Sequence, residues 1–444
     1  MSDYHSTAEA LLDLLTTPTR LGSRPGLEKI RQLLALFGDP HRGTPIVHVG
    51  GTSGKGSTAT MTAEILRSAG YRVGLHVKPH LERVEERFVV DGAPIAPDDL
   101  VALIRGATVA ARIVQPSWYE LTVALALRYF RDQKVDVAVV EVGLGGTYDA
   151  TNVVDPVVAV LTNVGLDHTE VLGDTIEKIV ADKVGIAKAG RPMVSGVTQP
   201  SAREIVFAGC AAAGAPLWLS EADFVAEPVA VTHRGSRFDY RSRAATLSNV
   251  LLAPLGRHQV ANAALAIAAL EASGLVDPVS RSDVVRDALG KVRIPGRLEI
   301  AATDARLVLD GAHNPAKMFA FVQALDEIFP GRPVTAVVAF KRGHDVGSTL
   351  RALANRATGL ILTSFEAVTD FGRGQAVTSD ELVSLLGAHG IDLPFQVELD
   401  PARAVAAALE RAPDRGLVAV TGSLYLVGVI RGWLRSGNPA QKLL

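Results

Sequence analysis

Cysteine is almost absent from this sequence, because Cys210 is the only one among 444 residues. No intrachain disulfide can therefore form, and a zinc site built from several cysteines is excluded. A large charge imbalance is missing too, since 45 Lys and Arg residues oppose 47 Asp and Glu residues for a formal net charge of -2. No long basic tract is present, so a nucleic acid is not expected as the main partner.

Long hydrophobic runs are also missing. No apolar stretch approaches the roughly 20 residues that a membrane span needs, and the Ala-rich residues 260–274 are interrupted by Asn262 and Glu271. The N-terminus carries early acidic residues and lacks the basic, apolar pattern of a signal peptide. We therefore expect a soluble, cytoplasmic protein without a membrane partner.

The length of the chain favours two domains, because it exceeds what one ordinary core covers. Short β-branched runs alternate with longer helical patterns, which is the order of a parallel sheet covered by helices. The runs in the first part are residues 45–50, 72–77, 135–143, 156–165 and 192–197. Residues 215–256 differ and predict a small antiparallel sheet, with a helix following at about 258–273.

The strand and helix pattern restarts near Pro295 and Gly296. Four further strand candidates follow, at residues 305–313, 333–340, 357–365 and 416–428. We therefore predict an α/β protein with a first domain of residues 1–294 and a smaller α/β domain of residues 295–444.

Residues 50–58, GGTSGKGST, follow the apolar run 46–49 and open a helical pattern. They depart from the common P-loop, because Val49 stands where its first glycine should be and Gly56 separates Lys55 from the hydroxyl residue. A strand, a tight loop and a helix starting near Lys55 would nevertheless direct backbone N–H groups and a positive charge at a phosphate. The alternative is a turn that merely favours glycine. The coincidence of strand, loop, lysine, hydroxyl pair and helix favours a nucleotide site.

This loop resembles the GT-x-GKG-[ST]-T loop of the Mur ligase superfamily, and the most similar branch is the folylpolyglutamate synthase/dihydrofolate synthase family. Further segments follow in that family's order, at residues 20–34, 141–152, 166–173, 181–190, 256–267, 295–299, 309–315 and 420–428. The resemblance implies a P-loop-containing parallel-sheet ATPase domain of the Mur ligase central-domain type and a smaller Rossmann-like C-terminal domain.

The activity that the resemblance implies is ATP-dependent amide ligation. A carboxylate, from dihydropteroate or a reduced folate, takes the γ-phosphate of ATP and becomes an acyl phosphate, which the amine of L-glutamate attacks. The implied cofactors are ATP, two Mg²⁺ ions, a monovalent cation and a CO₂-derived carbamate on Lys183, and a monomer is expected. Two alternatives stay open: a ligase of the same superfamily for a non-folate carboxylate, and a non-catalytic ATP-binding module.

Family motifs also imply the site residues, and strand ends support some of them. Glu141 ends an apolar run and His168 follows another, which predicts both at the carboxyl edge of a parallel sheet, where ligands bind. The implied ATP contacts are Gly51, Thr52, Ser53, Gly54, Lys55, Gly56, Ser57, Thr58, Asn262, Arg297 and Asp310. The implied metal ligands are Ser57, Glu141, His168 and carbamylated Lys183. The implied catalytic residues are Lys55, His168, Lys183, Arg297, Asp310 and His313.

Ordinary structural roles, such as a rim glutamate, a structural histidine or a surface lysine, remain the alternatives. If Lys55 and Arg297 touch one ATP, the two domains must close on it.

The expected acceptor side is the least regular part of the resemblance. The implied substrate contacts are Lys78, His80, Glu120, Thr122, Thr147, Asp149 and Asn152. Aromatic side chains in residues 117–122 could stack on a flat heterocycle or belong to a helix core. Lys78 stands where the family has a metal-binding serine, and an ammonium has no lone pair for Mg²⁺. Thr147 replaces an arginine and Ser53 an asparagine.

Overall fold

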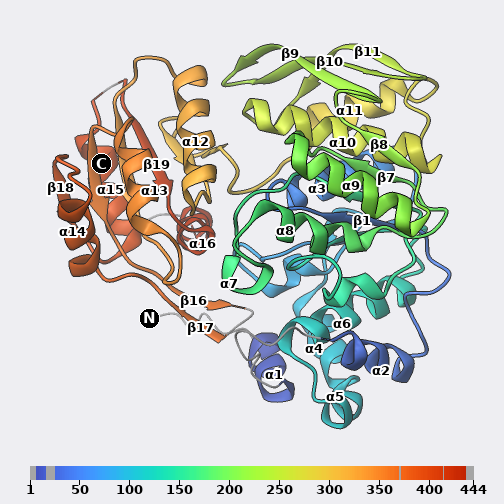
Figure 1. Cartoon of the computed structure of the whole chain (residues 1–444). Coiled ribbons are helices and arrows are strands. Elements are labelled where there is room, and N and C mark those ends of the chain that lie inside the picture. Colours follow the sequence, from blue (N-terminus) through green and yellow to red (C-terminus); the bar gives the residue numbers. More distant parts are fainter. Residues whose placement is uncertain (1–6, 17–25, 370–371, 414, 437–444) are drawn as a thin grey trace. The chain divides into compact units, whose positions relative to one another are not determined.

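The computed structural model describes residues 7–16, 26–369, 372–413 and 415–436 (Figure 1). The N-terminal residues 1–6, and residues 20–25 of the family-like segment 20–34, lie outside the described residues. The chain divides into two compact units. The first comprises residues 1–230, 236–253 and 258–292, and the second residues 231–235, 254–257 and 293–444.

The first unit is built on an eight-stranded sheet with the order β4-β3-β2-β5-β1-β6-β7-β8. Its strands are β1 (Ile46–Gly50), β2 (Val73–His76), β3 (Val89–Val90), β4 (Ala93–Pro94), β5 (Val137–Glu141), β6 (Val158–Leu161), β7 (Met193–Ser195) and β8 (Leu217–Leu219). All pairings from β2 to β8 are parallel, and β3 and β4 join antiparallel. Every residue of β1, β5 and β6 is buried, as expected of parallel strands covered on both faces. The predicted parallel-sheet fold and its five strands are confirmed.

Helices cover this sheet. They are α1 (Thr7–Leu15), α2 (Glu28–Leu36), α3 (Lys55–Ser68), α4 (Pro97–Arg105), α5 (Thr108–Val114), α6 (Trp118–Asp132), α7 (Thr169–Leu172), α8 (Ile176–Lys183), α9 (Pro200–Ala213), α10 (Arg257–Ser273) and α11 (Ser282–Lys291). One apolar core joins Ile46, Ala138 and Val140 of the sheet to helix residues such as Leu121. Short 3₁₀ turns occupy Val84–Arg87, Ala150–Val153 and Val184–Ile186.

A three-stranded antiparallel sheet follows, with the order β11-β10-β9. Its strands are β9 (Phe224–Thr232), β10 (Gly235–Ser242) and β11 (Thr246–Leu252). The predicted antiparallel sheet and the helix after it, α10, are confirmed. The predicted range of 215–256 was too wide, because β8 pairs in parallel with β7 and extends the main sheet instead.

The second unit contains a six-stranded sheet with the order β12-β13-β19-β14-β15-β18. The strands are β12 (Glu299–Ile300), β13 (Leu307–Leu309), β14 (Val334–Val338), β15 (Gly359–Leu362), β18 (Phe395–Val397) and β19 (Leu417–Thr421), all parallel except β12. A separate hairpin joins β16 (Glu366–Thr369) to β17 (Gly372–Gln375). The helices are α12 (Pro315–Ile328), α13 (Val346–Ala354), α14 (Ser379–Ala388), α15 (Pro401–Arg411) and α16 (Leu424–Arg435).

The last predicted strand, residues 416–428, was too long. It stops at Thr421, because Gly422 has a positive φ of 96° and Ser423 caps the following helix α16. The hydroxyl of Ser423 accepts a hydrogen bond of 3.2 Å from the N–H of Tyr425. The apolar residues after Gly422 therefore form a helix face, which an apolar run alone does not distinguish from a strand.

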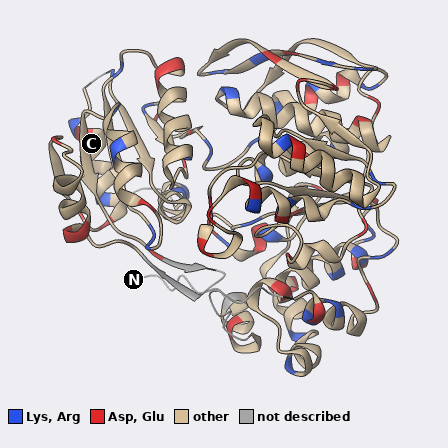
Figure 2. Cartoon of the chain, in the orientation of Figure 1, with Lys and Arg blue, Asp and Glu red and all other residues tan. Residues whose placement is uncertain are grey.

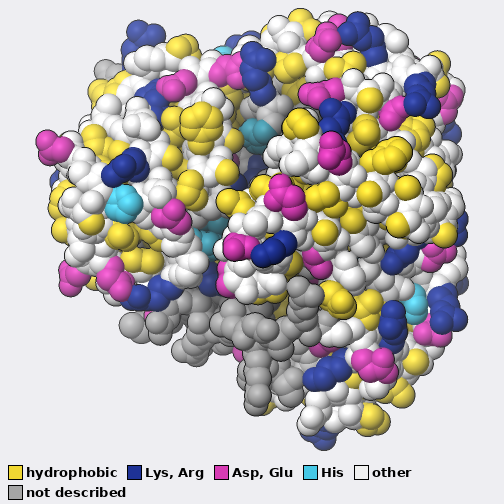
Figure 3. All heavy atoms as spheres, in the orientation of Figure 1, with side chains coloured by type: hydrophobic (Ala, Val, Ile, Leu, Met, Phe, Trp, Pro, Cys, Tyr) yellow, Lys and Arg dark blue, Asp and Glu magenta, His cyan; other side chains and the backbone are white. Residues whose placement is uncertain are grey.

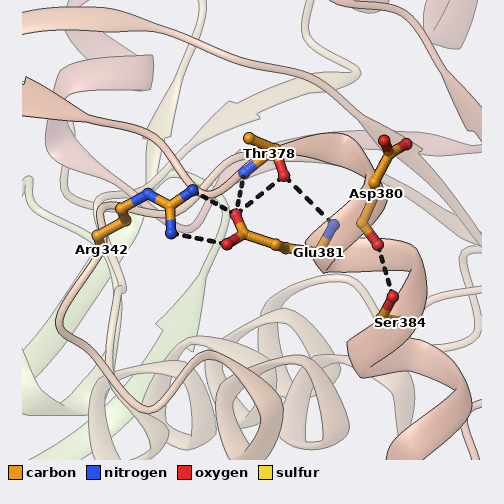
Figure 4. Close-up of polar contacts among 5 residues, drawn as sticks. All are labelled: Arg342, Thr378, Asp380, Glu381 and Ser384. Carbon is orange, nitrogen blue, oxygen red and sulfur yellow. Dashed lines mark hydrogen bonds and ion pairs between the residues drawn. The ribbon is translucent and has the colours of Figure 1, made fainter.

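The start of α14 shows how polar side chains fix a helix end in the second unit (Figure 4). The Thr378 hydroxyl accepts from the Glu381 N–H at 3.3 Å, and the Glu381 carboxylate accepts from the Thr378 N–H at 2.9 Å. The Arg342 guanidinium donates two hydrogen bonds to that carboxylate and, as the main cause, lowers the pKa of Glu381 to about 2. Loop and helix are thereby joined, and the Ser384 hydroxyl donates to the Asp380 carbonyl one turn further on.

Charged residues of both signs are mixed throughout the ribbon of each unit (Figure 2). On the face drawn in Figure 3, positive and negative side chains lie scattered among apolar ones. This mixing agrees with the small net charge of -2. Among the residues that the structure describes, no helix combines the length and the apolar character that crossing a membrane requires.

Candidate active site

The glycine loop connects β1 to α3 at the carboxyl end of the first sheet. Gly51 and Gly54 both have positive φ angles, of 134° and 80°. A side chain on Gly51 would collide with Thr162, and one on Gly54 with Asn262. Glycine is therefore required here for both backbone angle and space, and a glycine-rich turn between a strand and a helix is typical of a phosphate cradle.

Two residues at the end of β6 hold this loop in place. The Thr52 and Ser53 N–H groups donate to the main-chain carbonyl and the side-chain amide oxygen of Asn163, at 3.0 and 2.9 Å. The Thr162 hydroxyl donates to the Ser53 carbonyl at 2.6 Å. Sequence reasoning missed both supports. Their signal was available, because polar residues directly after an apolar strand lie on the same sheet edge as Glu141.

Two lysines converge on the loop from different helices. The Lys55 ammonium donates to the carbonyls of Gly51 and Thr52 at 3.0 and 3.3 Å. The Lys183 ammonium donates to the same Gly51 carbonyl at 3.1 Å. Lys183 is buried, and its burial lowers its pKa to about 8. A minor but useful fraction of neutral amine is thus present near neutral pH, which is the form that reacts with CO₂.

Glu141 ends β5 and pairs in register with Val49 of β1. Its buried carboxylate accepts the N–H of Lys78 at 3.0 Å. A side chain on Gly56 would come within 3.2 Å of the same Glu141 Oε2 atom, so the carboxylate lies against the first turn of α3, which also carries Ser57. A carboxylate and a hydroxyl beside a phosphate cradle are the oxygen ligands that Mg²⁺ prefers. These residues fit one magnesium ion.

His168 has a positive φ of 50° and precedes α7. Partial desolvation lowers the pKa of His168 to about 4 although its side chain is 41% exposed, and the Lys78 and Lys55 cations act in the same direction, so the imidazole is neutral at pH 7. Its Nδ1 lies 3.7 Å from a carboxylate oxygen of Glu170. Within the described ranges, no three His, Cys, Asp or Glu side chains converge as a metal site. The side chains as they stand therefore do not fit a second magnesium ion at His168.

Asp149 organises the loop after β5. Its carboxylate accepts from the N–H groups of Leu144 and Thr151 at 2.7 and 3.0 Å and from the Thr151 hydroxyl at 2.5 Å. Because that hydroxyl donates to Asp149, it accepts from Nε2 of His48 at 2.8 Å. His48 is fully buried, and burial lowers its pKa to about 3. This histidine, which the sequence did not single out, thus supports the loop through its hydrogen bond to Thr151.

Thr147 and Asn152 bind the same loop to the end of α8. The Thr147 hydroxyl donates to the Asp182 carbonyl at 2.8 Å. The Asn152 amide donates to the carbonyls of Thr147 and Gly185 at 3.0 and 3.2 Å. Both residues were predicted as substrate contacts, and these hydrogen bonds connect them to the protein main chain.

Most residues of the segment 117–122 are buried, and Tyr119 lies beside the loop after β5. Glu120 accepts from the Ser117 N–H at 2.7 Å as part of a capping box, and the buried Thr122 hydroxyl donates to the Tyr119 carbonyl at 2.9 Å. Trp118 is buried, whereas the Tyr119 ring packs against Gly143 and its hydroxyl lies 3.4 Å from Asp149. Tyr119 is therefore the aromatic residue next to the loop.

Two further predicted residues of the first unit, His80 and Asn262, have hydrogen-bond partners within the protein. His80 is buried, and its Nδ1 accepts from Nε of the buried Arg87 at 3.0 Å. Asn262 lies on α10, where its amide donates to the Gln259 side chain at 2.9 Å and its oxygen faces Gly54. Asn262 thus lies directly against the glycine loop.

In the second unit, Asp310 follows β13 and is buried. Its carboxylate accepts from the N–H groups of Leu298 and Ala312, both at 2.8 Å. Burial raises its pKa, and the Arg297 cation opposes that rise. Asp310 therefore fixes the segments that carry Arg297 and His313.

His313 has a defined proton position. The Lys317 ammonium donates to its Nε2 at 3.1 Å, so its Nδ1 carries the proton and donates to the Gly311 carbonyl at 2.7 Å. Burial and the nearby Lys317 hold the pKa of His313 well below the usual histidine value. Its ring lies 5.1 Å, centroid to centroid, from that of His344. This imidazole is neutral at pH 7.

The parallel sheet, the glycine loop at its carboxyl edge and the lysines on that loop define a nucleotide-binding α/β protein of the P-loop type. Residues 49–270 match the Mur ligase middle domain, and residues 296–435 match the C-terminal domain of dihydrofolate synthetase. The chain belongs to the folylpolyglutamate synthase/dihydrofolate synthase family of Mur ligases.

Relatives and solved structures agree over nearly the full length. A dihydrofolate synthase/folylpolyglutamate synthase of Bacillus subtilis is 32% identical over 94% of this chain and 96% of that protein. A probable bifunctional folylpolyglutamate synthase/dihydropteroate synthase of Haloferax volcanii is 35% identical over 98% of this chain, which spans 51% of that longer protein.

Folylpolyglutamate synthase of Mycobacterium tuberculosis, solved with ADP and AMPPCP, is 31% identical with a TM-score of 0.85, over 92% of this chain and 95% of that one. Escherichia coli FolC, solved with DHPP and ADP, is 28% identical with a TM-score of 0.84, over 98% of this chain and 99% of that one.

Proposed function

We propose that this chain is an ATP-dependent ligase that joins L-glutamate to a folate-type carboxylate through an acyl phosphate, as a dihydrofolate synthase, a folylpolyglutamate synthase or both. The observation that carries the proposal is the glycine loop of residues 51–58 between β1 and α3, with the Lys55 and Lys183 ammonium groups on its carbonyls. The relatives solved with ADP, AMPPCP and DHPP support the same reading.

The proposed chemistry begins with phosphoryl transfer. A carboxylate oxygen of the acceptor bonds to the γ-phosphorus of ATP, and the bond from that phosphorus to the β,γ-bridging oxygen breaks to release ADP. The amine of glutamate then bonds to the activated carbonyl carbon and loses a proton. The bond from that carbon to the phosphate oxygen breaks, and inorganic phosphate leaves.

We assign the binding of the transferring phosphate to the glycine loop. Its N–H groups and the Lys55 ammonium stabilise charge on the transferring phosphoryl group. Ser57 and Glu141 would hold Mg²⁺, which when bound neutralises phosphate charge. We assign Asn262 to the nucleotide because it lies against Gly54. The remaining residues of the loop 51–58 are proposed as further contacts of the nucleotide.

Three residues of the second unit complete the proposed nucleotide contacts. Arg297 presents paired donors to phosphate. Asp310 holds its segment through two main-chain hydrogen bonds. His313 is neutral with its proton on Nδ1, so its Nε2 can accept a hydrogen bond from a ligand once Lys317 turns away.

On the acceptor side, the half-exposed Tyr119 ring and Lys78 are the groups best arranged to meet a substrate, whereas Asp149 is buried and holds the loop beside Tyr119. Thr147, Asn152, Glu120, Thr122 and His80 would act mainly by holding this surface in shape. A carbamate on the buried Lys183 is proposed because its amine is partly neutral near pH 8. A monovalent cation and the monomeric state stay predictions.

The test is ATP turnover by the purified chain with dihydropteroate, tetrahydrofolate and a panel of amino acids. We expect ADP release that requires both a pterin acid and L-glutamate, with a product one glutamate heavier. Turnover with another carboxylate alone would instead identify a non-folate ligase. ATP binding without any turnover would identify a non-catalytic module.

A further inference from the structure

The main chain of Lys78 lies within the candidate site. It follows the end of β2 by two residues, and its N–H donates to Oε2 of Glu141 at 3.0 Å. Glu141 is the carboxylate that fits a magnesium ion next to Ser57. The main chain of Lys78 is thus fixed beside that position. The place of its ammonium group therefore affects the binding of any cation there.

The ammonium of Lys78 points along the acceptor side. Its Nζ lies 5.7 Å from the centroid of the Tyr119 ring, a distance at which an aromatic face attracts a cation. Its charge also lowers the pKa of His168 and of Lys183, so it lies within electrostatic reach of both. Among the residues that the structure describes, the half-buried Lys78 ammonium makes no hydrogen bond or ion pair. It is a positive charge directed at the site without a protein counter-ion there.

A second divalent cation near His168 would meet two obstacles. The Glu170 carboxylate lies 3.7 Å from Nδ1 of His168, but the groups at the family's metal-ligand positions are a nitrogen of His168 and the Lys78 ammonium, whereas Mg²⁺ prefers oxygen ligands and an ammonium has no lone pair. It would also be repelled by the Lys78 charge, and solvent screens that repulsion less in a partly buried site than on the surface. If Lys183 carries a carbamate, the Lys78 ammonium is already present to neutralise it.

We propose that the Lys78 ammonium takes the place of one of the two divalent cations expected in a ligase of this kind. The nucleotide-bound chain then holds a single divalent cation, at Ser57 and Glu141, and Lys78 supplies the remaining positive charge to the reacting carboxylate. This inference rests on the proposed function, because it takes ATP as the ligand of the glycine loop.

The experiment counts bound Mn²⁺ by electron paramagnetic resonance on the full chain, with bicarbonate present and the chain in excess over AMPPCP. We expect one bound Mn²⁺ per bound nucleotide in the wild type. Lys78→Ser removes the charge and adds an oxygen ligand, so this variant should bind two. Lys178→Ser, at an exposed lysine of α8 that pairs with Asp174, is the matched control and should bind one.

A second variant covers the case in which Lys78→Ser does not fold. Lys78→Met removes the charge without adding a ligand, so the single Mn²⁺ should bind about three- to tenfold more tightly than in the wild type. Two Mn²⁺ ions in the wild type, one in a folded Lys78→Ser variant, or unchanged affinity in Lys78→Met would each overturn the inference. Failure of AMPPCP to bind the wild type would overturn the proposed function itself, whereas AMPPCP binding with two Mn²⁺ ions would overturn this inference alone.

Discussion

The ammonium of Lys183 donates a 3.1 Å hydrogen bond to the carbonyl of Gly51, although 132 positions separate the two residues. The contact joins the C-terminal end of α8 to the glycine loop after β1. It places a buried lysine, whose pKa burial lowers to about 8, directly on the proposed phosphate cradle. The contact links α8 to the glycine loop, and a carbamate on this lysine is a prediction that can be tested.

Carbamylation of Lys183 should follow the titration of its amine. Below about pH 8, the neutral fraction rises about tenfold per pH unit. With ¹³C-labelled CO₂ held at constant dissolved concentration, NMR should detect a carbamate signal that grows from pH 6.5 to pH 8. Lys183→Ala should lack the signal, and Lys188→Ala should keep it. A signal that survives in Lys183→Ala would assign the carbamate elsewhere.

Lys55→Ala should abolish most activity without unfolding the chain. The variant removes the charge proposed to stabilise the transferring phosphoryl group, which corresponds to a loss of at least 100- to 1,000-fold in turnover. ADP release with a pterin acid and L-glutamate measures the effect, and circular dichroism checks the fold. The surface variant Lys178→Ala should retain wild-type turnover. Normal turnover by Lys55→Ala would contradict the assignment of the loop.

The sequence was sufficient to predict β1, β2, β5, β6 and β7 of the first sheet and β13, β14, β15 and β19 of the second, because buried parallel strands are continuous apolar runs. The short strands β3, β4, β12 and β18 were not predicted. The sequence predicted the glycine loop and Glu141 for a related reason, since polar residues after such apolar runs lie at the ligand-binding edge. It did not predict β8, whose residues are only half-buried at the edge of the sheet. It also read residues 416–428 as one strand, because apolar content does not show that Gly422 turns the chain into a helix.

The supports of the site were harder to predict than its centre. Asn163 binds Ser53 across 110 positions, and His48 reaches Asp149 through Thr151. Such contacts depend on which strands are neighbours in the sheet, and local patterns do not contain that information. The resemblance to Mur ligases supplied the residue list, but it could not show that Thr147 and Asn152 bind the main chain of the protein.

Asn163→Ala should loosen the glycine loop. The variant removes the side-chain acceptor of the Ser53 N–H, and a lost hydrogen bond of this kind costs about 1 kcal/mol. We expect roughly five- to tenfold weaker binding of AMPPCP by calorimetry, with a small loss in thermal stability. Asn355→Ala, at an exposed residue of the second unit, is the control. Unchanged AMPPCP affinity in Asn163→Ala would show that the loop keeps its conformation without this support.

His48 should make the fold sensitive to acid. Burial lowers its pKa to about 3, whereas the unfolded chain keeps a value near 6.5. Between these values the unfolded state binds more protons, so the free energy of unfolding falls by about 1.4 kcal/mol per pH unit as the pH decreases. His48→Gln removes this contribution, and its unfolding free energy in urea should fall less steeply from pH 6.5 to pH 4.5.

The control for that comparison is His233→Gln, which changes an exposed histidine between β9 and β10. Its urea curves should follow those of the wild type across the same pH range. If His48→Gln and the wild type lose stability in parallel, the buried imidazole is not what makes this fold sensitive to acid.

The most direct measurement of the central claim follows an oxygen atom. The chain is incubated with ATP, magnesium, L-glutamate and dihydropteroate labelled with ¹⁸O in its carboxylate. Transfer of the γ-phosphate to that carboxylate predicts inorganic phosphate that carries one ¹⁸O atom, formed together with the glutamate adduct. Phosphate without label, or no phosphate release that depends on glutamate, would contradict the account.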